Sequence, residues 1–588
     1  MPGRHTARHP AQDVTGGKQL ALAHARTGSV RCPVMRTTVA VATLLATACS
    51  TGEPPATTAT YLAPTEHLAR ASLALRGIRP SPAELRAVAA EPDRVAALVD
   101  RYLESAEFGA TIRDLHDELL LLHPELTNFT PPPAPPLSDI SFTDMNRSIY
   151  DEPLRLIEDI VMTDQPYTRI VTAGYAMADR TVATVWGLDH SERDGWERTR
   201  WNDDRGAAGI LASTALYLRY RSVALNYNRA RANAISRSLL CHDFSESDIH
   251  IDTRVNLSDP AVVADAVVHD PSCAGCHQAM DPLASYFFPF LQGTMNNVYV
   301  PAYPIDFYQP DAASAWMTTT GRPPGYFGTQ PDGLAGLGKA IAADPRFARC
   351  AAINFASYLT EKPARDLPPA WIAELQDGFV QSGYSAKLLA RAIVMSDEFR
   401  TASSADPVAA EGVIGYQKVR PAQLARMLAD LAGSAWQADT TAAINGWAFG
   451  RVDYLADDYL GYRVLAGGID AWFVTAPTHT MNATATLVTR AAARQAAAFV
   501  VDHDGAAPPA GRRLFTRAAV DDVDPAHVRA ELAELHARIY SELVEPDDPV
   551  LDDGAALFAG ALAASGDARR AWTVTLTGML SDLRAIYF

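Results

Sequence analysis

The sequence lacks several features that would point to common classes of protein. It has no uninterrupted apolar run of 18 or more residues, the length a membrane-spanning helix needs, which argues against a channel or transporter. Positive charge is scarce, because 51 Lys and Arg face 68 Asp and Glu and give a formal net charge of −17. Phosphate backbones are bound by basic faces, so nucleic acid is not an expected partner.

Catalytic motifs are also missing. The chain contains no HExxH and no GxSxG with a plausible triad. Gly333–Lys339 fits GxxxxGK, but Ala340 occupies the place of the magnesium-binding Ser or Thr. The sequence therefore favours a non-catalytic role over that of an enzyme.

What the chain does contain is typical of a folded, mainly α protein made of several helical bundles. It has 588 residues, of which 48% are hydrophobic, enough for a sizeable core. Ser81–Glu84 is a capping box with Pro at the first helical position. Two apolar stripes follow the helical period: Val95, Leu98, Val99, Tyr102 and Leu103, and then Leu388, Ala392, Met395 and Phe399.

A short phrase occurs twice. Arg79-Pro80 and Arg420-Pro421 each precede a helix start. A diverged helical repeat and chance are both open explanations. Composition and patterning predict an N-terminal extension and signal (1–49), a tether (50–64), an N-terminal helical domain (65–130), a central domain (139–345), a closing helical domain (346–402) and a C-terminal helical domain (416–588).

The N-terminal region predicts export. From Met35, the expected true start, one Arg is followed by about a dozen apolar residues and then by Ala46-Thr47-Ala48-Cys49. This segment resembles a bacterial lipobox, which implies a lipid on Cys49 and attachment to a membrane. An ordinary signal peptide with an incidental Cys is the alternative. Either way, we expect a periplasmic or outer-membrane location.

Cysteines carry the strongest signal. Cys273, Cys276 and His277 form a CxxCH, in which two thiols add to the vinyl groups of one haem c and the imidazole binds its iron. Three alternatives are a structural disulfide or empty motif, a redox dithiol and half of a zinc site. With haem attached, Cys241 and Cys350 remain as an even pair in the exported body, and parity predicts a disulfide between them.

The sixth iron ligand would decide between electron transfer and ligand chemistry. Met317 is the first candidate, Met295 the second, and His242, His250 and His269 are the remaining ones. The aromatic run Tyr286–Leu291 would either line the haem or be ordinary core. Five arginines, at 219, 221, 229, 231 and 237, would either pair with haem propionates or form a solvated helix face.

These residues resemble a family. Cys273–Ala284, CAGCHQAMDPLA, is similar to the CxxCH segment of the planctomycete-cytochrome-type proteins, which are exported proteins of planctomycetes and myxobacteria with several domains of unknown function. The resemblance covers roughly residues 65 to 400, including Arg205–Leu211 and Met395–Arg400, and in the tail only pieces such as Gly467–Asp470. It implies an exported haem module and leaves the chemistry open.

Together these observations predict an exported, lipid-anchored, mono-haem c-type protein that transfers one electron to or from a partner protein at the cell envelope. Two alternatives remain open. One is a non-enzymatic surface protein with a structural CxxCH, and the other is a haem enzyme or sensor with an open distal site.

Overall fold

The computed structural model describes residues 59–123, 128–133, 135–191, 193–220, 228–246, 255–290, 297–299, 303–440, 449–457 and 459–588. The predicted signal peptide, Cys49, Arg221, His250 and Met295 lie outside these residues. The chain divides after Ala56, and the residues from Thr57 to Phe588 form one compact unit.

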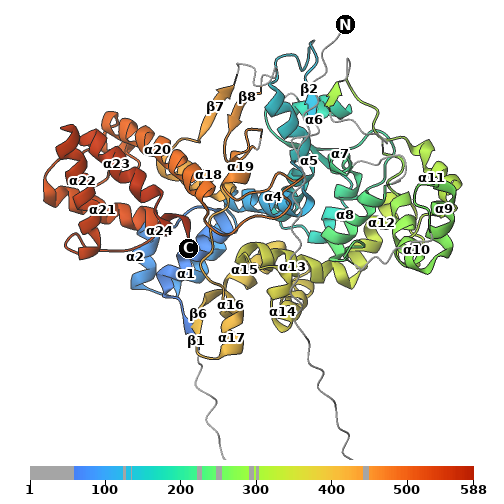
Figure 1. The fold of residues 1–588 in the computed structure, drawn as a ribbon, viewed down its shortest axis with the longest axis horizontal. Coiled ribbons are helices and arrows are strands. Elements are labelled where there is room, and N and C mark those ends of the chain that lie inside the picture. The colour runs from blue at the N-terminus through green and yellow to red at the C-terminus, as the bar shows by residue number, and fades with distance from the viewer. Residues whose placement is uncertain are drawn as a thin grey trace, which may run out of the picture. The chain divides into compact units, whose positions relative to one another are not determined.

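Helices dominate this unit, and the prediction of a mainly α protein is confirmed. The described residues contain 24 helices, and helix makes up 59% of the structure (Figure 1). The first half holds α1 (Pro64–Arg76), α2 (Pro82–Ala90), α3 (Arg94–Tyr102), α4 (Ala106–Leu120), α5 (Phe142–Met162), α6 (Arg180–Trp186), α7 (Thr214–Arg219), α8 (Arg229–Leu240), α9 (Pro260–His269), α10 (Pro271–Ser285) and α11 (Ala313–Thr320).

The second half continues the helical pattern. It holds α12 (Gly333–Ala343), α13 (Pro345–Thr360), α14 (Pro369–Gln381), α15 (Ala386–Val394), α16 (Asp397–Arg400), α17 (Pro407–Gly412), α18 (Pro421–Ala432), α19 (Tyr462–Leu465), α20 (Ala483–Ala506), α21 (Pro525–Leu535), α22 (Asp552–Ser565), α23 (Ala568–Leu580) and α24 (Leu583–Ile586).

Strands occur only as short pairs. Three pairs are antiparallel and one, β2 with β5, is parallel. The pairs are β1 (Ala59–Tyr61) with β6 (Thr401–Ser404), β2 (Asn128–Thr130) with β5 (Asn297–Tyr299), β3 (Ala176–Ala178) with β4 (Glu197–Thr199), and β7 (Gln437–Thr440) with β8 (Gly450–Asp453).

Local sequence signals explain several helix boundaries. Ser81 caps α2 as predicted, because its hydroxyl accepts the Glu84 N–H and the Glu84 carboxylate accepts the Ser81 N–H. The stripe from Val95 to Leu103 faces the core on α3. The second stripe is wrong at Leu388, which is 51% exposed, and at Ala392, which is also exposed, because α15 turns Leu389, Ile393 and Val394 inward instead.

Two large hydrophobic cores and one small cluster of Leu121, Ile469 and Ala471 lie in the described part of this unit. The first runs from Leu68 to Ile414 and so includes residues of all three segments predicted as 65–130, 139–345 and 346–402. The second runs from Val419 to Ile586 and also takes in Leu73. Helix α1 contributes to both cores, and its residues from His67 to Leu75 are all buried, which is typical of a helix packed on every side.

Candidate haem-attachment site

The CxxCH lies in the first turns of α10. Asp270 ends α9 and caps α10, because its carboxylate accepts the Ser272 N–H at 2.9 Å and Pro271 occupies the first helical position. Cys273 and Cys276 are therefore one helical turn apart and His277 follows directly. This is the spacing that the sequence predicted, now on a capped α-helix.

Both thiols are free and partly exposed. The Cys276 sulfur lies 3.9 Å from the carbonyl oxygen of Phe244, so the segment after α8 reaches the motif. Phe244 in turn packs against His242, with ring centroids 4.7 Å apart, and stacks in parallel over Phe327 at 6.2 Å. An aromatic group thus lies beside Cys276, formed by residues far apart in the sequence.

His277 is held by a buried carboxylate. Its Nδ1 lies 3.0 Å from Oδ1 of Asp281, one turn further along α10, and an ionised carboxylate only accepts, so Nδ1 donates. Arg229 on α8 binds the same carboxylate, with Nε 2.7 Å from Oδ1 and Nη2 3.0 Å from Oδ2. This arrangement leaves Nε2 of His277 as the nitrogen with a free lone pair, as a metal ligand requires.

Electrostatics favour the ionised form of Asp281. Burial by itself raises the pKa of this carboxyl, but the hydrogen bonds from His277 and Arg229 outweigh that effect and lower the pKa below its ordinary value. The carboxylate therefore stays charged and keeps His277 in one tautomer.

The motif and the helix before it are thinly packed, and two exposed side chains of that helix are apolar. None of residues 271–280 is buried, and Ala266 is the one buried residue of α9. Val262 and Val268 on α9 are both exposed, although α9 packs directly on α10. Covering exposed apolar side chains of this kind with a large apolar group is energetically favourable.

The candidate sixth ligands differ in their surroundings. Met317 lies on α11, a helix that packs against α10 (Figure 1). Its side chain is 49% exposed. His242 lies in the aromatic group beside Cys276. His269 is exposed and pairs with Asp265 at 2.9 Å on its own helix. The described candidates thus all lie on segments next to α10, and His269 differs from Met317 and His242 in being paired with a carboxylate on its own helix.

The arginines before Cys241 have structural roles that neither predicted alternative described. Arg231 is buried and donates to the carbonyl oxygens of Tyr220, Phe287 and Phe290. Burial lowers its pKa to about 9. Arg219 donates to the Ala471 carbonyl at 2.7 Å. These guanidinium groups are therefore engaged with protein, as is Arg229 through Asp281.

The aromatic run after α10 is ordinary core. Phe287 and Phe290 are fully buried in the first core, and Phe290 packs on Tyr217 with centroids 4.1 Å apart. These rings therefore fix the end of α10 and do not line the surface near the thiols.

A disulfide joins Cys241 and Cys350, whose Cα atoms are 5.3 Å apart. It links the end of α8 to α13 across 109 positions of sequence. Because α8 also carries Arg229, the same helix connects the disulfide to the carboxylate that holds His277.

Further groups bear on the site and its alternatives. Asp281 and Phe244 were not predicted as site residues, and Arg229 was predicted only as a possible partner of the haem propionates, not of Asp281. The signals for Asp281 were its place inside the Cys273–Ala284 segment and its spacing of four residues, one helical turn, from His277. Within the described ranges, no three His, Cys, Asp or Glu side chains are arranged to hold a metal ion directly. Likewise, none of the helices in those ranges has the length and apolar character to cross a membrane.

Comparisons with known proteins add no assignment. No family model, no curated protein and no solved structure matches this chain.

Proposed function

We propose that this protein is an exported mono-haem c-type protein that transfers one electron at the cell envelope, with the haem on Cys273 and Cys276 and His277 as its proximal ligand. The observation that carries the proposal is the pairing of two free thiols, one helical turn apart, with an imidazole whose Nδ1 is held by a buried carboxylate. Bound haem would supply an iron that cycles between two oxidation states.

The residues fit this group. The thiols are accessible for thioether formation, and Asp281 with Arg229 orients the imidazole from the side opposite to the metal-binding nitrogen. The exposed side chains of α9 offer apolar cover for a macrocycle. In this proposal α9 to α11 form a cytochrome-c-like segment within a protein of several helical bundles, as the resemblance to planctomycete-cytochrome-type proteins implies.

Location and partners follow the same reasoning. Disulfides persist in oxidising compartments, so the Cys241–Cys350 bond supports export to the periplasm or outer membrane. We place the lipid anchor on Cys49 and expect a redox protein, not a nucleic acid, as the partner. Met317 is our first candidate for the sixth ligand, Met295 the second as before, and His242 the next among the described residues.

The test is covalent haem. The chain is co-expressed with a haem-c maturation system, denatured and washed, and a pyridine haemochrome spectrum is recorded. We expect about one haem per chain. Cys273→Ala and Cys276→Ala should each reduce covalent attachment, and the double variant should abolish it.

The matched control is Cys241→Ala with Cys350→Ala, which removes two cysteines and leaves the CxxCH intact. It should keep its haem. Absence of haem from the unaltered, correctly exported chain would contradict the proposal and favour a surface protein with a structural CxxCH.

The spin state separates the two haem alternatives. A low-spin spectrum that becomes high-spin in Met317→Ala, or in His242→Ala, identifies the sixth ligand and supports electron transfer. A high-spin spectrum in the unaltered protein would instead favour the enzyme or sensor with an open distal site.

A further inference from the structure

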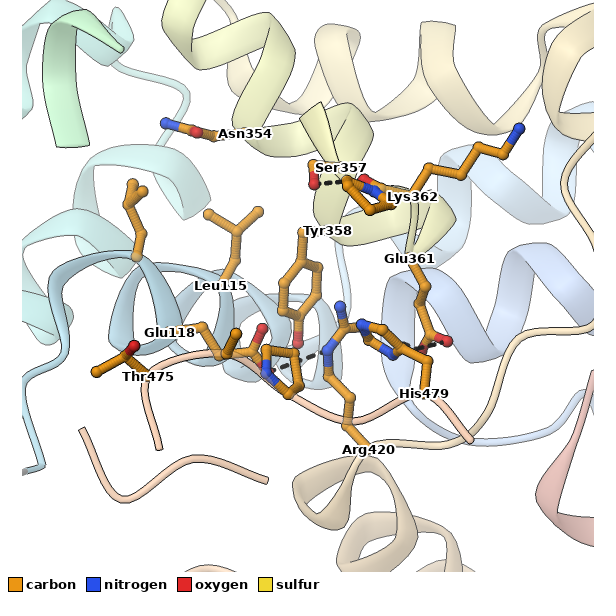
Figure 2. Close-up of a pocket in the computed structure, with 14 residues that line it drawn as sticks. Leu115, Glu118, Asn354, Ser357, Tyr358, Glu361, Lys362, Arg420, Thr475 and His479 are labelled. Carbon is orange, nitrogen blue, oxygen red and sulfur yellow. Dashed lines mark hydrogen bonds and ion pairs between the residues drawn. The ribbon is translucent and has the colours of Figure 1, made fainter. Parts of the chain in front are cut away.

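A separate cavity of about 330 Å³ lies between the two cores. Its walls come from α4, from the end of α13 and the residues after it, from Arg420 before α18, and from the segment 475–479 (Figure 2). Leu115 and Leu119 give it an apolar side. None of the residues predicted to bind haem lines it.

Charged side chains at the cavity compensate one another. Arg420 is 6% exposed, and its Nε and Nη1 donate to Glu118 at 3.0 Å and to Glu361 at 3.2 Å (Figure 2). His479 Nδ1 lies 3.1 Å from the other oxygen of Glu361. Lys362 also lines the cavity, and its Nζ donates to the carbonyl oxygens of Glu411 and Gly412. The lining thus holds two cations and two carboxylates and is neutral overall when His479 is uncharged.

One polar group beside this cavity has no protein partner. Tyr358 is 6% exposed, and its hydroxyl makes no hydrogen bond within the described part of the chain. The Arg420 guanidinium lies over its ring, 3.9 Å from the centroid. Native proteins rarely leave a buried hydroxyl unsatisfied, so this group points to a ligand or water at the site.

The loop that leads into the lining segment 475–479 has a fixed backbone and an exposed aromatic side chain. Oδ1 of Asp470 accepts the backbone N–H groups of Trp472, Phe473 and Val474 at 2.7 to 2.8 Å. Gly467 adopts φ +98°, and a Cβ there would lie 2.7 Å from the Thr478 carbonyl oxygen. The loop is therefore fixed, yet Phe473, two residues before the lining residue Thr475, is 79% exposed.

We propose that this cavity binds a neutral polyhydroxylated ligand, namely a saccharide unit. A sugar hydroxyl both donates and accepts, and so matches a lining that mixes carboxylates, amide, hydroxyls and imidazole. An anion would meet Glu118 and Glu361, and a cation would meet Arg420 and Lys362. The exposed ring of Phe473 offers a face for the apolar C–H side of a pyranose. The inference does not depend on haem.

The experiment is isothermal titration of the protein with cellohexaose, maltohexaose and chitohexaose, with glutamate and spermidine as charged probes. We expect saturable binding of at least one oligosaccharide and none of the charged probes. Phe473→Ala and His479→Ala should each weaken that binding by about tenfold.

Phe499→Ala is the matched control, because it removes a partly exposed aromatic from α20, which contributes nothing to the cavity. Far-ultraviolet circular dichroism of each variant checks that it is folded. The inference is overturned if no oligosaccharide binds at millimolar concentration, if a charged probe binds more tightly, or if both cavity variants bind as the control does.

Discussion

Burial sets the chemistry of several individual side chains. Glu152 on α5 is almost completely buried, and one of its oxygens accepts the Ser213 hydroxyl. Burial raises the pKa of Glu152 to about 7, although Ser213 and the more distant Arg205 act in the opposite direction. Folding therefore favours the neutral acid at this position.

A pH-dependent loss of stability follows for Glu152. Its folded pKa of about 7 exceeds the ordinary 4.5, so its contribution is fully present below pH 4.5 and is lost as pH rises through 7. Across that range the unaltered protein should lose about 3 kcal/mol of unfolding free energy that Glu152→Gln retains. Denaturant titrations of both proteins below pH 4.5 and above pH 7 measure the difference.

Glu374→Gln, at an exposed position on α14, is the control and should follow the unaltered protein. Burial also raises the pKa of Glu531 to about 7. Glu531 is present in all three proteins, so its effect on the pH dependence of stability cancels when they are compared. If the free energy of unfolding changes with pH in the same way for Glu152→Gln and the unaltered chain, Glu152 is not desolvated as described.

At the scale of elements, α8 connects the disulfide with the candidate haem site. Cys241 follows its last residue in a left-handed conformation, φ 49°, and Cys350 is buried on α13. Asn354 adds a second tie, because its side-chain amide donates to the Ser238 carbonyl at 3.1 Å. Arg229, at the other end of α8, reaches Asp281.

Reduction of this disulfide should destabilise the protein. Closing a loop of 109 residues restricts the unfolded chain, and the chain-entropy estimate is about 5 kcal/mol. We expect reductant to lower the thermal midpoint of the unaltered protein. The double variant Cys241→Ala with Cys350→Ala should have an equally low midpoint, and reductant should not lower it further. If reductant lowers the thermal midpoint of that double variant by the same amount, the loss of stability comes from Cys273 and Cys276 instead.

At the scale of the whole unit, the two Arg-Pro phrases act across the two cores. Arg79, between α1 and α2, is buried and donates to the carbonyl oxygens of Tyr540, Arg584 and Ala585 at 2.8 to 3.1 Å. Arg420 reaches the other way, to Glu118 and Glu361. Each guanidinium thus satisfies acceptors that belong to the opposite part of the chain.

Removing one of these contacts should loosen the C-terminal helices first. Arg79→Ala leaves three carbonyl oxygens without their donor and should cost about 3 kcal/mol. Hydrogen exchange should accelerate in α23 and α24 more than in α13. Arg86→Ala, which removes a half-exposed ion pair with Glu534 from the neighbouring helix, should cost less than about 1 kcal/mol. If hydrogen exchange in Arg79→Ala accelerates equally in all helices, this division into two cores is contradicted.

Features that depend on neighbours in sequence were determined by the sequence itself. The helical class, the Ser81 cap, the stripe from Val95 to Leu103 and the helical spacing of the CxxCH thiols all follow from residues within a few positions of one another. Met317 and the haem itself remain predictions of that kind, and the spectra described above test them.

The tertiary structure alone decided which distant side chains contact one another. Asp281 meets Arg229 from 52 positions away, and the cavity joins Leu115, Tyr358, Arg420 and His479 from segments spread over the chain. No local pattern encodes such contacts, because they depend on how helices pack and on which polar groups burial leaves in need of a partner. Leu388 shows the same limit, since a helical stripe has the right period but only packing decides which side of the helix faces the core.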